Sequence, residues 1–277
     1  MTEPILIVIG DVLHEPWYSI SVDGQMRTWL HDVDDDPRFR IRHSHSQPLG
    51  VIGGWFDRTH ESARWWDRTR GLIPRLDDAI GRPWREKRAR VSVGTWAGSS
   101  QVAWSQAMPD LYALQRWKIV TSMTQALTED NWTYVYFTTA SSYVRTERLR
   151  ERIEALPRAR VYAGTLMVEG VTGETFASGA NRVFSRDVVE LVVRNRREYS
   201  NDVMEDVGLG RLLTKHGIHV TAWPSLNLTS QMELDAVSDA ELLEHHHFRL
   251  RSEKNGRRND VELMHALHER LRLLESE

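Results

Sequence analysis

The chain contains no cysteine among its 277 residues, which excludes disulfide bonds, thiolate metal sites and cysteine nucleophiles. It also has no long apolar run. The run from residue 5 to residue 9 is too short for a signal-peptide core or a membrane span, and no later stretch approaches about 18 apolar residues. Charge of one sign is not in excess, because 36 basic side chains stand against 39 acidic ones. We therefore expect a cytoplasmic protein without a membrane span, and without a general attraction to nucleic acid or lipid.

Lysine is scarce, since it supplies only four of the 36 basic residues and leaves 36 − 4 = 32 arginines. This skew is typical either of a G+C-rich coding bias or of anion recognition. The eleven tryptophans can pack in a core or against the flat face of a sugar or base. With 40% hydrophobic residues, the chain has enough apolar material to fold as one elaborated domain spanning 1–277.

The pattern of apolar residues predicts an α/β fold. The β-branched run at 5–9 ends in Gly10-Asp11, as expected of a buried parallel strand that opens into a loop. Further strands are expected at 39–42, 91–93, 132–137, 161–168 and 218–220. Helices are expected at 23–30, 110–127, 145–156, 188–193 with Ser185 as a cap, 203–214 and 261–274. Ligands of open α/β sheets bind where the parallel strands end. We therefore expect a mostly parallel central sheet flanked by helices, with a site at that edge.

Three segments carry polar or glycine-rich motifs in a fixed order: Thr139-Ala140-Ser141 after the strand that ends near Phe137, Phe176-Ala177-Ser178-Gly179-Ala180 leading to Ser185-Arg186-Asp187, and Glu205-Asp206. Together they resemble the fringe and β-1,3-galactosyltransferase group. In that group a strand ends in an acidic triplet, followed by a Ser-Gly-Gly or Ser-Gly-Ala loop, a Ser-Arg-Asp helix start and a Glu-Asp-Val segment. Arg27-Thr28-Trp29 is similar to the group's Arg-x-Thr-Trp.

The resemblance implies a Rossmann-like GT-A glycosyltransferase fold, with a nucleotide-binding half at 1–145 and an acceptor-binding half at 146–277. It further implies transfer of a sugar, with inversion, from a nucleotide-sugar donor of the uridine diphosphate class to a hydroxyl acceptor. The residues expected to bind the donor are Gly10, Asp11, Arg27, Thr139, Ala140, Ser141, Ser178, Gly179, Ala180, Arg182 and Arg249.

Asp206, beside Glu205, is the candidate general base. Inverting transfer needs a carboxylate to take the acceptor proton, and a positioned base contributes roughly 10²- to 10⁴-fold to the rate. An acidic pair at a helix start has a second explanation, because carboxylates there complement the helix dipole. Glycine at 179 would let the backbone approach a phosphate or sugar oxygen closely, although a plain turn has the same composition.

The departure from the group lies at its acidic triplet, where this chain has Thr139, Ala140 and Ser141. Hydroxyl and methyl groups lack the anionic oxygens that a divalent cation such as Mn²⁺ or Mg²⁺ prefers. Three explanations stay open. Arginines and backbone amides stabilise the departing diphosphate, or another residue holds the metal, or the site is inactive. The acidic segment at 32–36 is expected to be a solvated loop.

The stretch His245-His246-His247-Phe248-Arg249 is similar to a late histidine of the group that reaches the metal and diphosphate. His247, and after it His246, are the candidate metal ligands. Without carboxylate partners a histidine could still donate to a phosphate oxygen. An exposed polar strand or loop is the other reading of this stretch.

The acceptor is open between a glycan, a lipid-linked intermediate, a protein, a small metabolite and DNA. A phage-type DNA glycosyltransferase acting on hydroxymethylated pyrimidines is suggested by the basic segment 82–90, with more positive charge at 194–197 and 249–258. Arginine-rich faces that are simply solvated have the same composition. A non-catalytic sugar- or nucleotide-binding relative, and a histidine-based metalloprotein, are the remaining alternatives.

Overall fold

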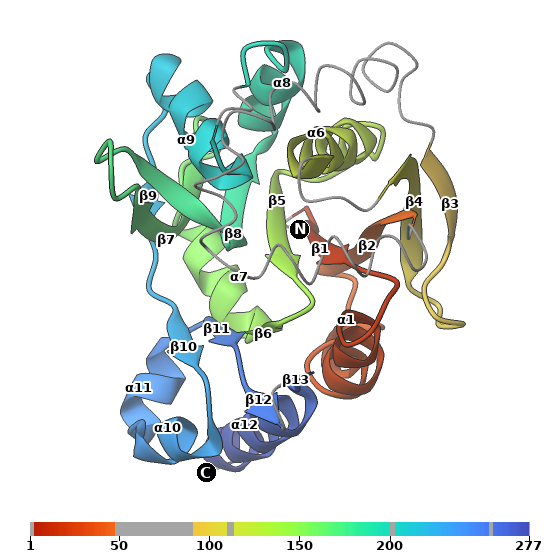
Figure 1. Ribbon diagram of the computed structural model, residues 1–277, viewed down its shortest axis with the longest axis vertical. Helices are drawn as coiled ribbons and strands as arrows, with labels where there is room; N and C mark the ends of the chain where they lie inside the picture. Colours follow the sequence, from red (N-terminus) through yellow and green to blue (C-terminus); the bar gives the residue numbers. More distant parts are fainter. Residues whose placement is uncertain (1–2, 48–90, 110–113, 200–202, 255–256, 277) are drawn as a thin grey trace.

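The computed structural model describes residues 3–47, 91–109, 114–199, 203–254 and 257–276 (Figure 1). Its centre is an eight-stranded sheet with the strand order β3-β4-β2-β1-β5-β8-β7-β9. The bounds of these strands are β1 Ile5–Asp11, β2 Phe39–Gln47, β3 Val91–Thr95, β4 Val102–Pro109, β5 Tyr134–Thr139, β7 Tyr162–Val168, β8 Thr175–Ser185 and β9 Thr221–Ala222.

Parallel pairing dominates the middle of this sheet. Strand β1 runs parallel to both β2 and β5, and β4 is parallel to β2. Strand β8 reverses direction and lies antiparallel between β5 and β7. Within the parallel part Gly10 lies opposite Thr139, so β1 and β5 end side by side. The predicted α/β class, with a mostly parallel central sheet flanked by helices, is confirmed.

The alternation of apolar residues along β1 feeds two cores, one on each face of the sheet. Ile5, Ile7 and Ile9 pack on one face, and Leu6 and Val8 on the other. The first face is covered by α7 (Thr146–Glu154), α12 (Val261–Glu275) and the π-helical turn η1 (Ile20–Gly24). The second face is covered by α6 (Gln115–Ala126), α8 (Arg186–Arg194) and α9 (Glu205–Lys215).

A smaller sheet of β10 (Leu226–Leu228), β11 (His247–Leu250) and β6 (Ser142–Val144) lies below the central sheet in Figure 1. Strand β6 follows β5 directly, so this small sheet joins the end of β5 to the last part of the chain. The remaining elements are α1 Trp17–Ser19, η2 Gln25–Arg27, η3 His31–Val33, α10 Gln231–Ala236, α11 Asp239–Glu244, β12 Glu253–Lys254 and β13 Arg257–Arg258. None of the helices in the described part of the chain has the length and apolar character that a membrane crossing requires.

Some expected elements differ from those observed. The helix expected at 23–30 is instead the end of a π-helical turn followed by a 3₁₀ turn. The strand expected at 218–220 is wrong, because pairing with β7 begins only at Thr221. Ser185 does not cap α8 with its side chain; its hydroxyl donates to the Asp187 carboxylate at 2.5 Å and accepts from the Val161 N–H. The start of the helix expected from residue 110 lies outside the described residues, and α6 begins at Gln115.

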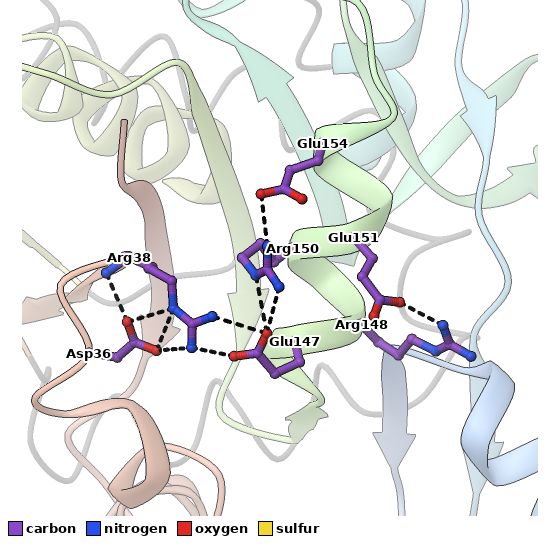
Figure 2. Close-up of polar contacts among 7 residues, drawn as sticks. All are labelled: Asp36, Arg38, Glu147, Arg148, Arg150, Glu151 and Glu154. Atoms are coloured by element: carbon purple, nitrogen blue, oxygen red, sulfur yellow. Dashed lines mark hydrogen bonds and ion pairs between the residues drawn. The ribbon is translucent and has the colours of Figure 1, made fainter. Parts of the chain in front are cut away.

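The charges of α7 are paired along its exposed face, as Figure 2 shows. Arg150 donates to Glu147 and to Glu154, and Arg38 at the start of β2 lies between Asp36 and Glu147. Exposed pairs of this kind contribute about 0–1 kcal/mol each. They therefore orient α7 against β2 more than they stabilise it.

Gly210 is where α9 comes closest to β8. A Cβ added there would lie 2.6 Å from Phe176 Cβ and 3.0 Å from the Thr175 carbonyl oxygen. We therefore expect Gly210→Ala to lower the free energy of unfolding by about 1–2 kcal/mol, because overpacking outweighs the higher helix propensity of alanine. Urea unfolding measures the change. Gly94→Ala is the matched control, since a Cβ there meets nothing within 4 Å. Equal stability of the two variants would contradict the prediction.

Candidate functional site

The edge of the sheet where β1 and β5 end gathers most of the residues singled out from the sequence. Thr139, half-buried, is the last residue of β5 and lies opposite Gly10. Ala140 and Ser141 form the two-residue turn into β6, and both are buried. At the position of the group's acidic triplet this chain therefore has a tight turn. Of the three residues there, Thr139 alone is not fully buried, and its side chain carries a hydroxyl.

Strand β8 carries the predicted glycine loop as a bulge. In the pairing with β7, Arg182 lies opposite Gly164 and Ala177 opposite Leu166, so 178–181 face only one residue of β7. The prediction of a loop here is therefore wrong, because the segment belongs to a strand. The pairing of this strand with β7 is nevertheless interrupted at the predicted position. Bulges bend a strand and re-aim its backbone. Here the Ala180 carbonyl accepts a hydrogen bond of 2.9 Å from the Thr138 hydroxyl, which holds the bulge against the end of β5.

Asp206 lies at the start of α9 and points back to this bulge. Its carboxylate accepts hydrogen bonds from the backbone N–H groups of Val207 and Gly179. Burial raises the pKa of Asp206 to about 6, and the neighbouring charge of Glu205 adds to the rise. The structure therefore brings together the end of β5, the backbone at Gly179 and the carboxylate at 206.

Glu205 has a different environment from its neighbour. Its carboxylate is 8% exposed and forms an ion pair of 3.0 Å with Arg182, whose side chain is 1% exposed. The Tyr199 hydroxyl donates to the same carboxylate at 2.6 Å. Burial is the largest single influence and would lower the pKa of Arg182, but the charge of Glu205, its hydrogen bond and the charges of neighbouring tyrosines together outweigh burial, and the pKa is raised. The side chains of Arg182 and Glu205 are therefore engaged with each other, although the sequence had predicted that Arg182 binds the donor.

Strand β11 brings the predicted histidine stretch to the end of β5. His247 and Arg249 share one face, and Arg249 Nη1 donates to the Thr139 hydroxyl at 3.1 Å. His247 lies within hydrogen-bond distance of the Ser142 hydroxyl at 3.1 Å and of the Ser225 hydroxyl at 2.6 Å. The alternative of an exposed polar strand is wrong, because His247 is 1% exposed.

His246 points to the other side of β11. Its Nε2 lies 3.0 Å from Asn181 Oδ1, which also accepts a hydrogen bond from Tyr136. Burial lowers the pKa of His246 to about 3, and the charge of Arg152 lowers it further. Burial likewise holds the pKa of His247 well below its usual value. Both imidazoles are therefore neutral at physiological pH. Among the described residues, no group of three or more His, Asp or Glu side chains is arranged to hold a metal ion.

Two other residues predicted to bind the donor, Asp11 and Arg27, pair with other side chains. Asp11 is buried at the end of β1, and its Oδ2 lies 2.6 Å from His43 Nδ1. Arg27 is exposed and pairs with Asp23 at 2.9 Å. The basic segment 82–90 lies outside the described residues.

Sequence reasoning missed Gln25, although its side chain reaches the site. Its side-chain amide donates to the carbonyl oxygens of Thr139 and Ser142 at 3.0 and 2.8 Å. Trp29 Nε1 donates to the same Ser142 carbonyl. No local pattern marks Gln25, because its partners lie more than 100 residues away in the chain.

A separate cleft of about 630 Å³ lies at the opposite edge of the sheet, where β1 and β5 begin. Arg38, Arg150 and Glu154 line it. Figure 2 shows Arg150 paired with Glu154, and both arginines paired with Glu147. This cleft has none of the candidate residues. We therefore place the candidate site at the other edge, where the strands end.

No protein-family model matches this chain, and no curated protein sequence does either. Solved structures do match, among them the apo crystal structure of mouse xyloside xylosyltransferase 1. That structure shares 8% sequence identity with this chain, and the match covers 90% of this chain and 97% of the mouse chain at a TM-score of 0.40. A likeness at that identity and score says nothing of activity, so the function rests on the residues of the site.

Proposed function

We propose that the chain is a glycosyltransferase that moves a sugar from a nucleotide-sugar donor to a hydroxyl acceptor, with inversion at the anomeric carbon. The observation that carries the proposal is the position of Asp206. Its carboxylate is held by the backbone N–H of Gly179 beside the end of β5, at the edge of the sheet where ligands of α/β folds bind. The order of the motifs along the chain supports the same class, with uridine diphosphate sugars as donors.

Asp206 is the general base of this proposed reaction. The acceptor oxygen attacks the anomeric carbon, the bond from that carbon to the diphosphate breaks, and the carboxylate takes the acceptor proton. A base works best when its pKa lies near the working pH, and a pKa of about 6 meets that condition. Glu205 and Arg182 do not meet the substrate in this scheme. They are positioning residues that fix the start of α9 and hence the direction of Asp206.

The donor is proposed to lie across the ends of β1 and β5, with Gly10 and Thr139 beneath it and the bulge at 178–180 beside it. Arg27 is exposed and pairs only with the exposed Asp23 among the described residues, so its side chain can turn toward a ligand at little cost. The first half of the chain then supplies most of the nucleotide contacts, and the second half supplies Asp206 and Arg249. No described residue favours DNA over the other acceptors.

The test uses water as the acceptor, since the natural acceptor is open. Purified protein is incubated with a panel of uridine diphosphate sugars, and release of the nucleoside diphosphate is followed from about pH 4.5 to about pH 8. Because only ionised Asp206 can take a proton, and its pKa is raised to about 6, we expect the rate to rise about tenfold per pH unit below that value and to level off above it.

Two results would argue against the proposal. Absence of release from every nucleotide sugar, together with stabilisation of the fold by those ligands, would identify a non-catalytic binding relative. Release without an acidic limb near pH 6 would remove Asp206 from the mechanism.

A further inference from the structure

The residues at the end of β5 do not fit a divalent cation. Thr139, Ala140 and Ser141 offer two hydroxyls and a methyl, and Ala140 and Ser141 are buried in the turn. Hard cations such as Mn²⁺ and Mg²⁺ bind anionic or carbonyl oxygens, and neutral hydroxyls alone hold them poorly. The Thr139 hydroxyl already receives a hydrogen bond from a guanidinium, that of Arg249. A second positive charge at the same oxygen would be repelled.

Arg249 is brought to this place by the two-residue period of β11. Phe248 and Leu250 are fully buried and point into the core beside α12. Arg249 lies between them and His247 precedes Phe248, so both must face the opposite side, toward Ser142 and Thr139. The Nε of Arg249 is buried and has no hydrogen-bond partner among the described residues. A buried donor without an acceptor is uncommon in folded proteins and is explained when a ligand supplies the acceptor.

Positive charge is in excess around Arg249. Arg251 and Arg258 lie close enough to affect its ionisation, and Asp260 and Asp206 are the carboxylates that also act on it. The carboxylate of Asp260 is already held by Arg258 Nε at 3.0 Å and by the Ser252 N–H at 2.8 Å. Burial, and then the two neighbouring guanidiniums, lower the pKa of Arg249 to about 10. Three guanidiniums and two carboxylates leave a local excess of one positive charge, which an anion would offset.

We propose that the guanidinium of Arg249, anchored on the Thr139 hydroxyl, is the cation that receives the diphosphate of the nucleotide sugar, in place of a divalent metal. This inference rests on the proposed function. When the bond from the anomeric carbon to the diphosphate breaks, its electron pair stays on the diphosphate oxygen. Arg249 stabilises that charge by hydrogen bonds and transfers no proton, and Arg251 and Arg258 strengthen the field.

The test is isothermal titration of the full chain with uridine diphosphate and with inorganic pyrophosphate, in the presence of a chelator. We expect both ligands to bind, and added Mn²⁺ to change the dissociation constant by less than about twofold. Arg249→Gln should weaken both ligands by about tenfold or more, since a charge-assisted hydrogen bond pair is lost. Arg196→Gln is the matched control. Its side chain is exposed just after α8 and, among the described residues, donates to the Val193 carbonyl alone, so binding should not change.

A second variant guards against misfolding of Arg249→Gln. Thr139→Val keeps the shape of the side chain but removes the oxygen that holds Arg249 Nη1, and it should weaken pyrophosphate by about threefold to tenfold. Binding that requires Mn²⁺, or unchanged affinity in both variants, would overturn the inference.

The result also separates this inference from the proposed function. Metal-free binding through Arg249 without turnover of any nucleotide sugar would support the anion site and contradict the proposed transferase activity. Turnover that requires Mn²⁺ and is unchanged in Arg249→Gln would support the transferase activity and contradict the role of Arg249.

Discussion

Asp206→Asn is expected to lower both sugar transfer and donor hydrolysis by about 10²- to 10⁴-fold, the range of a positioned general base. Asparagine has nearly the same shape and keeps an oxygen that can accept the hydrogen bond from the Gly179 N–H. It cannot take a proton from the acceptor, so the loss should appear in kcat rather than in the affinity for the donor. Release of nucleoside diphosphate in single-turnover experiments measures the step directly.

The stability of this variant has a predictable sign. The folded-state pKa of Asp206 is about 6, above its ordinary value of 3.8, because burial and Glu205 disfavour the charged form. The favourable contribution of this group to folding is therefore complete below pH 3.8 and is lost as the pH rises through about 6. At neutral pH, Asp206→Asn should be at least as stable as the native chain. Asp235→Asn, at an exposed carboxylate that accepts a hydrogen bond from Gln231, is the control for both measurements. Full hydrolysis by Asp206→Asn would assign the proton to another group.

Glu205→Ala is expected to lower the free energy of unfolding by about 3–5 kcal/mol. The reason is the ion pair with Arg182, whose side chain is 1% exposed. Without Glu205 the guanidinium loses its ion-pair partner and has too little contact with water to be solvated, and only the weaker influence of the Asp206 charge is known to act on it among the described residues. The Tyr199 hydroxyl loses its carboxylate acceptor at the same time and keeps only the backbone carbonyl of residue 205, at 2.8 Å, among the acceptors described. Urea unfolding at neutral pH gives the change.

The control for this prediction is Glu190→Ala. Glu190 also faces an arginine, Arg186 at 3.7 Å, but both side chains are more than one-third exposed, so removal should cost no more than about 1 kcal/mol. Replacing Arg182 and Glu205 together by Met and Leu should recover much of the stability, since two apolar side chains leave no buried charge. Similar small losses for Glu205→Ala and Glu190→Ala would mean that water reaches the Arg182 pair.

The central strands and helices could be predicted because their signals are local. The run at 5–9 specifies β1 by itself, and the stripe of apolar residues at 261–274 specifies α12. Strand β11 could not be predicted in this way, because His247 and Arg249 are polar residues and give no apolar pattern. His247 is buried and Arg249 is half-buried, and Ser142, Ser225 and Thr139, from other parts of the chain, supply their hydrogen-bond partners.

The candidate site was predictable in its positions but not in its contacts. The motifs located the end of β5, Gly179 and Asp206, and the structure places the three side by side. The sequence did not indicate that Arg182 pairs with Glu205, because that contact depends on the strand register that places Arg182 opposite Phe137. Register is fixed by the whole sheet and not by the residues near position 182. The roles assigned to these residues stay predictions until the variants are measured.

The register of β11 against β6 determines which side chain of β11 lies beside the end of β5. Arg249 lies opposite Ser142 and Phe248 opposite Tyr143. A slip of one residue along β6 would exchange the two faces of β11, as it does in any strand. The guanidinium would then enter the apolar core, and an aromatic ring would stand beside the Thr139 hydroxyl. Shortening or lengthening the segment between β10 and β11 by a single residue is thus a way to remove the positive charge from this edge without changing any side chain there.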